Sequence, residues 1–406
     1  MIALGTFDEN ANLEEYKEQV KKLTVVSGGQ WNNQLRDEGR WVGFQPIGDG
    51  DEMKVREVQE FLKGAGLFPH GKIDGICGYR TSSAIRLFQE YVRTVEGNAE
   101  IGFPDGKFGK VSLGQVRRWQ AGNLKADWAA LSGAAPSPEY AQWMSLLGKV
   151  KEHYLAAPSE MLKKLNAFSG TSDTIKVANW DFDPARIHMV GIRHRKEGTG
   201  AQVLDDLFIL LIHGMVFKFF GSTEPGTKVA SQYPFLVHGQ HHYRFGWHHV
   251  NEVDKVFQAL RPLDDDVLVV RSSKLFPTDA DLAGPLDKVP NKTINIHWSA
   301  KDDTAGWSAG CQVLSGKNYI NHRGQLIDCS KFAAGGYAAL GTKDAQSVYQ
   351  TKGAYTVLED LVAALSGAIR DDNVVRYMLL LEKDPDLHPE IGAGKAKEIL
   401  SRLKSA

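Results

Sequence analysis

The sequence predicts an α+β protein with several domains, helical near its N-terminus and mostly β in its larger part. Apolar residues recur at helical spacing up to about residue 170, and short runs separated by turn residues follow. A chain of 406 residues is also long enough for two or three hydrophobic cores. The expected segments are an N-terminal arm (1–48), a small helical domain (49–125), a helical connector (126–170), a mostly β domain with flanking helices (171–385) and a C-terminal helix (386–406).

The small helical domain is expected to contain helices joined by glycine-containing turns. Residues 55–62 place valine, phenylalanine and leucine at helical spacing, and residues 64–66 end that helix. A turn at residues 74–78 leads into a helix at residues 81–92, for which Thr81 is a good N-cap. Cys77 in this turn is expected to be a small buried residue.

This domain contains a short internal repeat. Its pattern is an Asp-Gly pair, a further glycine, an aliphatic-Arg pair and an aromatic-Gln pair at constant offsets. It occurs as Asp74-Gly75, Gly78, Ile85-Arg86, Phe88-Gln89 and again as Asp105-Gly106, Gly109, Val116-Arg117, Trp119-Gln120. The matched offsets favour a duplicated turn-and-helix unit. Capping turns and core aromatics without a duplication are the alternative.

The connector and the larger domain are expected to alternate between helices and strands. Residues 137–168 are helical, residues 186–194 form a strand, and residues 207–220 form a hairpin that turns at His213-Gly214. Further strands are expected at residues 233–247, 267–271, 293–297 and 374–381, and further helices at residues 343–370 and 393–404. Strands at such short spacing predict a compact, mostly β domain.

Composition and charge exclude several classes of function. The formal net charge is -1 and charged residues make up 24%, so no global field attracts nucleic acid or an anionic membrane. No run approaches the ~20 apolar residues of a membrane span. The first residues lack the basic and apolar regions of a secretory signal, so we expect synthesis in the cytoplasm. Three scattered cysteines do not indicate a disulfide framework.

Cys311 stands in a context suited to a nucleophile. Ser308, Ala309 and Gly310 leave no bulk before its sulfur, and such a turn aims backbone N–H groups at an oxyanion. His297 ends a β-branched run and is expected to project from the end of a strand. An imidazole can take the thiol proton, and an imidazolium lowers the thiol pKa from its usual value. The alternatives are a buried structural cysteine and a histidine that anchors a sheet edge.

The pair resembles the signature of a known enzyme family. Ile296-His297 followed by Ser308-Ala309-Gly310-Cys311 is similar to the motif of L,D-transpeptidases, which remodel peptidoglycan stem peptides through a cysteine acyl-enzyme. The resemblance implies that Cys311 is the nucleophile and His297 the base, and that Ser308 and Gly310 frame the cysteine.

The motif also departs from the usual family pattern. The interval between the histidine and the cysteine is shorter, Ala309 replaces a usual histidine, and Gln312-Val313-Leu314 stands where an apolar residue and a substrate-binding arginine are usual. A closer likeness is to a divergent set of phage and bacterial wall-active proteins, and it covers most of residues 186–315. The matching segments are Gly191-Ile192-Arg193, Asp205-Asp206, Ser222-Thr223-Glu224-Pro225-Gly226, Tyr243 with Gly246 and His248, and Asn295-Ile296-His297 with Ser308-Ala309-Gly310-Cys311-Gln312.

The small helical domain carries a second resemblance. It is similar to the peptidoglycan-binding domain attached to many cell-wall enzymes, which implies a module that holds the enzyme against the wall. The residues that carry this likeness are Val58-Gln59, Leu62, Gly66, Asp74-Gly75, Gly78, Thr81, Ala84 and Phe88-Gln89.

Together the two resemblances imply a wall-processing cysteine enzyme. Cys311 would attack the carbonyl of the diaminopimelate–D-alanine bond, and water would complete an L,D-carboxypeptidase reaction or an amine an L,D-transpeptidase reaction. The candidate substrate-binding residues are Arg193, Arg244, His248, His249, Trp298 and Gln312. No cofactor or metal is expected, and peptidoglycan is the expected partner. The missing secretory signal favours an antibacterial effector or phage lytic protein that reaches the wall by another export route, with secretion machinery or an immunity protein as further partners.

Two other functions stay open at this point. The histidines His238, His241, His242, His248 and His249 could hold Zn²⁺ in a peptidoglycan amidase or endopeptidase, although no His-Glu-x-x-His motif is present. The third alternative is a non-catalytic wall-binding protein in which Cys311 is structural.

Overall fold

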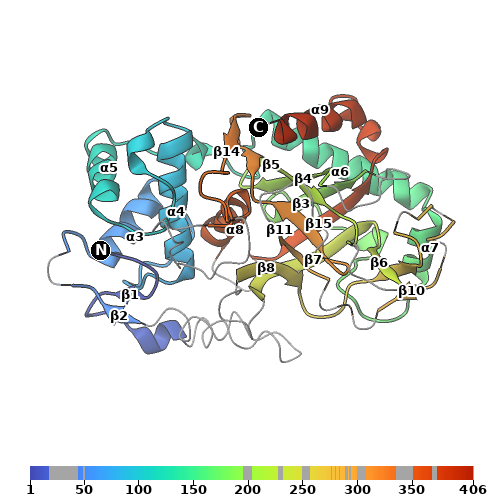
Figure 1. Cartoon of the computed structure of the whole chain (residues 1–406), viewed down its shortest axis with the longest axis horizontal. Helices are drawn as coiled ribbons and strands as arrows, with labels where there is room; N and C mark the ends of the chain where they lie inside the picture. The colour runs from blue at the N-terminus through green and yellow to red at the C-terminus, as the bar shows by residue number, and fades with distance from the viewer. Residues whose placement is uncertain are drawn as a thin grey trace.

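The computed structural model describes residues 1–17, 44–48, 51–194, 204–226, 232–248, 257–275, 277–278, 280–282, 284–288, 291, 294–299, 308–334, 351–367 and 373–405. Within these residues the protein is a mixed α+β molecule, as the sequence predicts. A helical module lies at one end of the longest axis and a β-rich body at the other, with helix α8 between them (Figure 1). None of the described helices combines the length and apolar character that crossing a bilayer requires.

The described helices lie within or close to the predicted segments, and the helix predicted at residues 343–370 is shorter, because α8 covers Ala354–Leu365. The module contains α3 (Val55–Gly64), α4 (Tyr79–Thr94) and α5 (Lys110–Ala121), with 3-10 turns at Ala99–Ile101 and Asp127–Ala130. The connector contains α6 (Pro138–Ala156) and α7 (Glu160–Ala167), followed by a 3-10 turn at Val177–Asn179. The C-terminal part contains α8 (Ala354–Leu365), a 3-10 turn at Asp384–Leu387 and α9 (Gly392–Lys404).

The strands fall into one large sheet and two small ones. A two-stranded sheet joins β1 (Thr6–Phe7) to β2 (Gln45–Pro46), and a three-stranded sheet has the order β10-β9-β6, from β6 (Tyr233–Leu236), β9 (Val269–Ser272) and β10 (Leu286–Asp287). The remaining strands are β3 (Ile187–Arg193), β4 (Asp206–Ile212), β5 (Met215–Ser222), β7 (Gly239–His248), β8 (Phe257–Pro262), β11 (Ile296–Ser299), β12 (Gln312–Ser315), β13 (Asn318–Ile320), β14 (Leu326–Asp328) and β15 (Val375–Leu381).

The large sheet closes on itself. Its strand order is β12-β11-β8-β7-β15-β3-β4-β5-β13-β14, and an additional β12–β5 pairing joins the ends of the segment from β12 to β5. The predicted hairpin is β4–β5, and its turn uses the positive φ angles of His213 (53°) and Gly214 (76°). Strands β3 and β15 pair in parallel inside the sheet, which explains why both are almost continuously apolar.

The predicted repeat corresponds to a repeated set of hydrogen bonds. Gln59 of α3 donates from Nε2 to Asp74 Oδ1, the Ile76 carbonyl and Thr81 Oγ1, and its Oε1 accepts from the Gly75 N–H. Gln89 of α4, which ends the first predicted unit, makes the equivalent four contacts around the second Asp-Gly turn, with Asp105, the Lys107 carbonyl, Ser112 and Gly106. Each helix therefore anchors the Asp-Gly turn that follows it.

The described parts of the N-terminal arm pack as part of the module. Asp8 accepts hydrogen bonds from the Val55 and Arg56 N–H groups at 2.8 and 2.9 Å, which caps the first turn of α3. Ile2 and Ile47 belong to the same buried cluster as α3 and α4. The rest of the arm, residues 18–43, lies outside the described residues.

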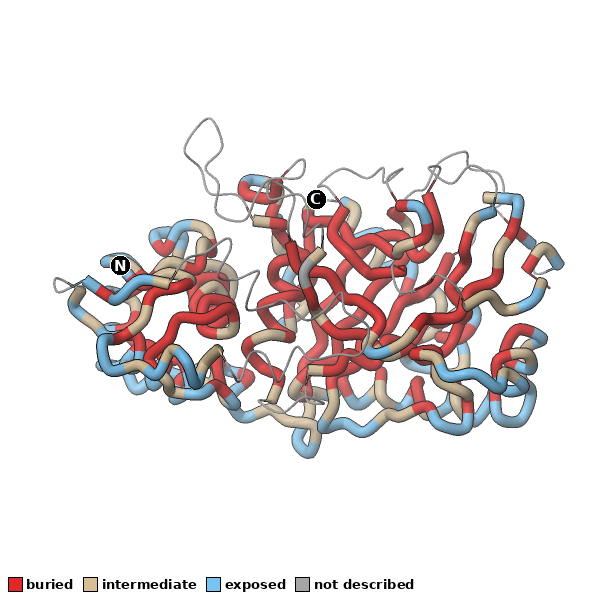
Figure 2. The backbone as a smooth tube through the Cα atoms, turned by 90° about the horizontal axis from the view of Figure 1, so that it is seen from below, coloured by how far each residue is buried: buried red, intermediate tan, exposed pale blue. Residues whose placement is uncertain are grey.

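One apolar core runs through the module, α8 and the inner face of the closed sheet. The cluster includes Val58 and Phe88 from the module, Tyr355 and Leu358 from α8, and Leu260 from β8. A second cluster joins α6, α7 and α9 to the opposite face of β3, β4, β5 and β15. Buried residues accordingly fill the middle of both parts of the molecule (Figure 2). The module is therefore built into the body and does not hang from it.

Some predicted elements differ from those observed. Thr81 is not an N-cap, because α4 already begins at Tyr79 after Gly78, and Thr81 instead contacts Gln59. The single strand expected at residues 233–247 is two strands, β6 and β7, which belong to different sheets. Gly239 has a φ of 122° at their junction, a backbone conformation that lets the chain change direction.

Candidate active site

Four adjacent strands bring the candidate catalytic residues into one row. Arg244 of β7 is the register partner of Arg261 of β8. Leu260 of β8 pairs with Ile296 of β11, so one residue further along this register Arg261 lies beside Asn295. Ile296 also pairs with Gln312 of β12, so Asn295 lies beside Cys311. Residues in one row point to the same face of a sheet. The row therefore runs from the two arginines through Asn295 to the sulfur.

Cys311 is half-buried directly before strand β12. Its Sγ accepts a hydrogen bond from the Asn295 N–H at 3.3 Å, in a position where a backbone carbonyl would otherwise continue the ladder. The following backbone N–H, of Gln312, donates to the Asn295 carbonyl at 2.9 Å. The sulfur is thus fixed at the point where the parallel β11–β12 ladder begins.

The turn before Cys311 is held by several short contacts. Ser308 Oγ donates to the Cys311 carbonyl at 2.7 Å and accepts from the Gly310 N–H at 3.2 Å. The Ser308 carbonyl accepts from the Gly226 N–H at 2.7 Å. A Cβ on Gly310 would lie 2.4 Å from Pro234 Cγ, so a larger residue would displace the turn. Because the Gly310 N–H donates to Ser308 Oγ inside the turn, Gly310 has a steric role here and not the oxyanion contact expected from the sequence.

His297 lies on the same face as Cys311. It is two residues beyond Asn295 on β11, and side chains alternate along a strand. Diagonal neighbours on adjacent strands are ~7–8 Å apart at Cα, a span that the two side chains can bridge. Its register neighbours across β8 and β7 are Ala259 and Gly246, and its ring packs against the rings of His248 and Phe257.

The protein fixes which ring nitrogen of His297 is available. Nδ1 lies 2.8 Å from the Trp298 carbonyl oxygen, which can only accept, so Nδ1 carries the proton and Nε2 is the basic nitrogen. The ring of His248 stacks on that of His297, with centroids 5.4 Å apart and planes at 22°. His248 Nδ1 lies 3.5 Å from Asn295 Nδ2, so Asn295 connects the second histidine to the row.

Burial favours the neutral forms of the Cys311 thiol and the His297 imidazole. It raises the pKa of the Cys311 thiol, and the Asn295 N–H, the Ser308 side chain and Arg261 each oppose this rise. Burial also lowers the pKa of His297, and the hydrogen bond to the Trp298 carbonyl offsets part of the decrease. These two shifts favour a thiol and a neutral imidazole over a thiolate–imidazolium pair.

Asn295 was absent from the residues singled out by sequence, although it forms part of the matching motif. Its side chain is 1% exposed, and Oδ1 has no hydrogen-bond partner among the described residues. A buried amide oxygen without a partner costs free energy, so it indicates an acceptor for a donor on a ligand. Arg261 was also missed, because an arginine in an apolar strand gives no local signal of the face on which it lies.

Three predicted substrate-binding residues lie away from this face. Arg193 is 1% exposed and donates to Thr223 Oγ1, the Thr223 carbonyl and the Leu236 carbonyl, so it supports the loop at residues 222–226. Gln312 is fully buried and accepts a hydrogen bond from Tyr377 inside the closed sheet. Trp298 is 2% exposed on the inner face, with Lys352 Nζ 4.1 Å from its ring centroid. The structure therefore assigns these three residues to support rather than to substrate contact.

Of the other three predicted substrate-binding residues, two lie at the Cys311 site and one lies outside the described residues. Arg244 and His248 lie on the same face as Cys311 and His297. His249 lies outside the described residues.

The described histidines of the alternative zinc site do not converge. His238 Nε2 lies 2.9 Å from Ser159 Oγ, while His241 is buried on the inner face and bonded to Thr174 and the Val237 carbonyl. His242 pairs in register with Arg376, and His248 stacks on His297. Among the described residues no group of three metal-ligating side chains is present.

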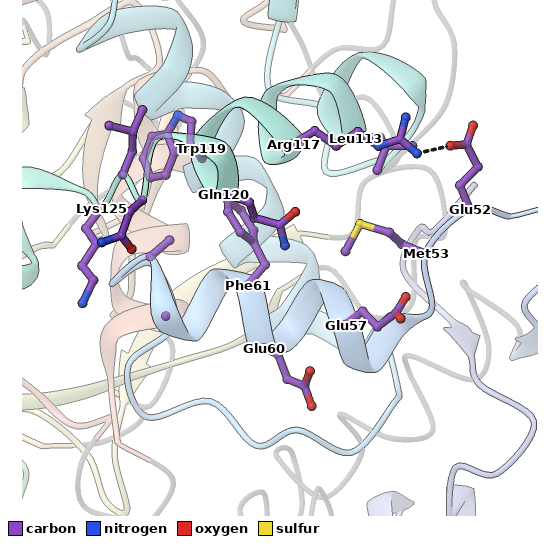
Figure 3. A pocket seen from close by; sticks show the side chains of 14 residues that line it. Glu52, Met53, Glu57, Glu60, Phe61, Leu113, Arg117, Trp119, Gln120 and Lys125 are labelled. Atoms are coloured by element: carbon purple, nitrogen blue, oxygen red, sulfur yellow. Dashed lines mark hydrogen bonds and ion pairs between the residues drawn. The ribbon is translucent and has the colours of Figure 1, made fainter.

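The helical module carries a groove. It has a volume of about 710 Å³ and opens between α3 and α5, with Glu57, Glu60 and Phe61 on one side and Arg117 and Gln120 on the other (Figure 3). Helix α4, in contrast, packs against α8. The face of the module that carries the groove is therefore left open by the body.

Comparison with known proteins adds no family. No family model, curated protein or solved structure matches this chain. The functional conclusion consequently rests on the geometry above and on the motifs in the sequence.

Proposed function

We propose that the protein is a cysteine enzyme that cleaves peptidoglycan stem peptides through an acyl-enzyme on Cys311. The observation that supports the chemistry best is the row that holds the Cys311 sulfur beside Asn295, with the basic Nε2 of His297 on the same face. The motif likeness to L,D-transpeptidases supports the substrate class.

The proposed reaction begins from the neutral pair. His297 Nε2 takes the thiol proton as the Cys311 sulfur attacks the carbonyl carbon of the diaminopimelate–D-alanine bond. The tetrahedral oxyanion forms next to the Cys311 N–H, since the Gly310 N–H is engaged by Ser308. The C–N bond then breaks, and protonated His297 returns its proton to the leaving D-alanine amine.

Water completes the proposed cycle. His297 removes a proton from water, which attacks the thioester carbonyl, and the Cys311 thiol is released together with the shortened stem peptide. An acceptor amine in place of water would give a transpeptidase. The unpartnered Asn295 Oδ1 is suited to accept an N–H of the donor peptide during both steps.

The groove between α3 and α5 is the proposed contact of the module with the wall. It is lined by both acidic and basic side chains, and polar groups of this kind can hydrogen-bond to a glycan or peptide strand. Because α4 and α8 fix the module on the body, binding there would also orient the Cys311 site relative to the wall.

The proposal is tested with purified protein and defined muropeptides, with products identified by mass spectrometry. We expect wild type to release D-alanine and Cys311→Ala to lose at least ~10³-fold in rate, because the nucleophile is absent. His297→Ala should lose ~10²–10⁴-fold. The matched control is Cys77→Ala, a buried cysteine in the module.

Undiminished cleavage by Cys311→Ala would overturn the proposal. Metal analysis of the same preparations separates it from the zinc alternative, in which a chelator, rather than loss of Cys311, abolishes cleavage. A chain that binds sacculi but cleaves no muropeptide would support the non-catalytic alternative.

A further inference from the structure

Two histidines meet where the module contacts the body. His70 lies between α3 and α4 of the module, and His213 lies in the β4–β5 turn of the body. Their Nε2 atoms are 3.1 Å apart, whereas their ring centroids are 5.2 Å apart, with planes at 50°. The Nε2 atoms are therefore the near ends of the two rings. The pair is distinct from the row that ends in Cys311, which crosses β7, β8, β11 and β12.

The module holds His70 in a fixed position. The Gly71 N–H donates to the Phe68 carbonyl at 3.0 Å, so His70 occupies a tight four-residue turn. The Phe68 side chain is buried, and the Arg80 guanidinium lies 5.6 Å from its ring centroid. Arg80 of α4 also donates to the Ala363 carbonyl of α8. The turn is consequently anchored to the two helices that join the module to the body.

The body holds His213 in a fixed position. It lies between Ile212 and Met215, which pair across the β4–β5 hairpin. The Gly214 carbonyl accepts a hydrogen bond at 2.9 Å from the N–H of Ser137, the N-cap of α6. His213 has a φ of 53°, a left-handed conformation in which histidine, like asparagine, is more frequent than most residues. Residues fixed on tight turns lose little backbone freedom when they bind a ligand.

The pair borders a cavity of about 510 Å³. Its other walls are residues 132–134, 183–187, 212 and 365–367. His70 is exposed and His213 is half-buried, so an ion can enter from solvent. Of the charged groups in the walls, Asp183 accepts from the Ala185 N–H and lies 3.6 Å from Arg186 Nε. Within the described residues no third metal-ligating side chain joins the two histidines, so water would complete the coordination of an ion.

The separation of the two nitrogens fits a shared metal ion. Imidazole nitrogens bind Zn²⁺ at ~2.0–2.1 Å, and a tetrahedral angle then separates two of them by roughly 3.3 Å. The observed 3.1 Å needs only a small rotation of either ring. A direct N–H···N hydrogen bond is the alternative, and it requires one protonated and one unprotonated Nε2. Burial and the neighbouring His70 lower the pKa of His213, which favours the neutral imidazole that binds metals.

We propose that His70 and His213 bind a divalent transition-metal ion between the module and the body. Imidazole suits Zn²⁺, Cu²⁺ and Ni²⁺, whereas Mg²⁺ and Ca²⁺ prefer oxygen ligands. One ligand comes from each part of the molecule, so the ion joins the two parts and stabilises the folded chain by mass action. The proposal does not depend on the chemistry proposed for Cys311.

Calorimetric titration with ZnCl₂ tests the site. The reference protein is Cys311→Ala without a histidine tag, because the half-buried thiol is a second ligand for zinc. In this background His70→Gln and His213→Asn should each weaken Zn²⁺ binding at least ~10-fold, since loss of a group that only supports a ligand already costs this much. Asparagine is itself favoured at the left-handed position of a two-residue hairpin turn, so His213→Asn retains the turn.

The matched control is His153→Gln, which removes an exposed histidine of α6 and should bind Zn²⁺ as the reference does. MgCl₂ should give no binding. Equal Zn²⁺ affinity in the reference and in both site variants would overturn the proposal.

Cu²⁺ reports how many histidines hold the ion. Cu²⁺ should bind more tightly than Zn²⁺ and displace it. Electron paramagnetic resonance of the reference with one equivalent of Cu²⁺ should show two imidazole nitrogens, and His70→Gln should show one. His70 is exposed, so its replacement leaves the core intact. An unchanged number of nitrogens in His70→Gln would contradict the site.

Thermal unfolding tests whether the ion stabilises the fold. Free Zn²⁺ at a hundred times Kd should raise the Tm of the reference by about 3 °C and leave that of His70→Gln unchanged. An equal increase in both proteins would show that zinc acts elsewhere, and this would overturn the proposal.

Discussion

At the scale of single residues, the site depends on where two polar groups point. His297 donates from Nδ1 to the Trp298 carbonyl, which leaves Nε2 as the base, and Asn295 contributes its N–H to the Cys311 sulfur. Burial favours the neutral forms of the His297 imidazole and the Cys311 thiol. In a neutral pair the histidine has to take the thiol proton during the attack. We therefore expect removal of the histidine to lower the rate more than it would in a site with a preformed ion pair.

The neutral pair predicts a specific pH dependence. The His297 pKa is lowered, so the base is already deprotonated near neutral pH and the acid limb of kcat/KM should lie below pH ~6.5. The Cys311 pKa is raised, so iodoacetamide alkylation should increase with pH and have its midpoint above ~8.5. Both profiles can be recorded on wild type with Cys311→Ala as the blank. An alkylation rate that is already maximal at pH 6 would contradict the neutral pair.

At the scale of elements, α4 and α8 join the module to the body. Arg86 of α4 binds Asp360 of α8 through both carboxylate oxygens, at 2.6 to 3.0 Å. The Arg86 and Asp360 side chains are 13% and 3% exposed. On the same helices Tyr79 donates to Glu359, and Arg80 donates to the Ala363 and Ser366 carbonyls. The contact is polar and buried, so each partner depends on the other.

Removal of one partner should therefore be costly. We expect Arg86→Ala to lower the free energy of unfolding by about 3–5 kcal/mol, because Asp360 would stay buried without its cation. Arg118→Ala removes an ion pair with Glu96 in which the arginine side chain is 44% exposed, and should change stability by at most ~1 kcal/mol. Urea unfolding followed by circular dichroism measures both. An equal decrease in the free energy of unfolding of the two variants would show that the buried ion pair between α4 and α8 stabilises the protein no more than an exposed one.

At the scale of the whole molecule, one apolar cluster spans the module, α8 and the closed sheet. A tethered binding domain would have a core of its own, whereas here the residues of α8 are buried from both sides. The groove between α3 and α5 and the row that ends in Cys311 are consequently held in a fixed relation.

A shared core predicts shared unfolding. We expect a single cooperative thermal transition, reported equally by the tryptophans of the module and by the β-sheet signal. Deletion of residues 51–130 should give an aggregating product, because it would expose the apolar face of α8. Two well-separated transitions, or a stable and soluble deletion product, would contradict the shared core.

The local features of the fold could be predicted from sequence because they depend on neighbours along the chain. Helices α3 and α9, the β4–β5 hairpin and the duplicated Asp-Gly turns follow from periodicity and turn residues. The Cys311–His297 pair is also local, since His297 lies in β11 and Cys311 directly precedes β12, the next strand along the chain and its parallel neighbour. Residues 249, 300–307 and 335–350 lie outside the described chain, so His249 and part of the helix expected at 343–370 stay predictions.

What the sequence by itself determined about this protein is thus its mixed α+β class, its repeat and a cysteine with a histidine nearby in the chain. Only the tertiary structure decided which polar residues join that pair. Arg193 and Arg244 both lie in strands, yet Arg193 supports a buried loop and Arg244 faces Arg261 beside the sulfur. Strand alternation assigns residues to two faces, but which face is covered depends on the strand order and on the helices that pack against the sheet. These partners come from distant parts of the chain, and no local pattern records them.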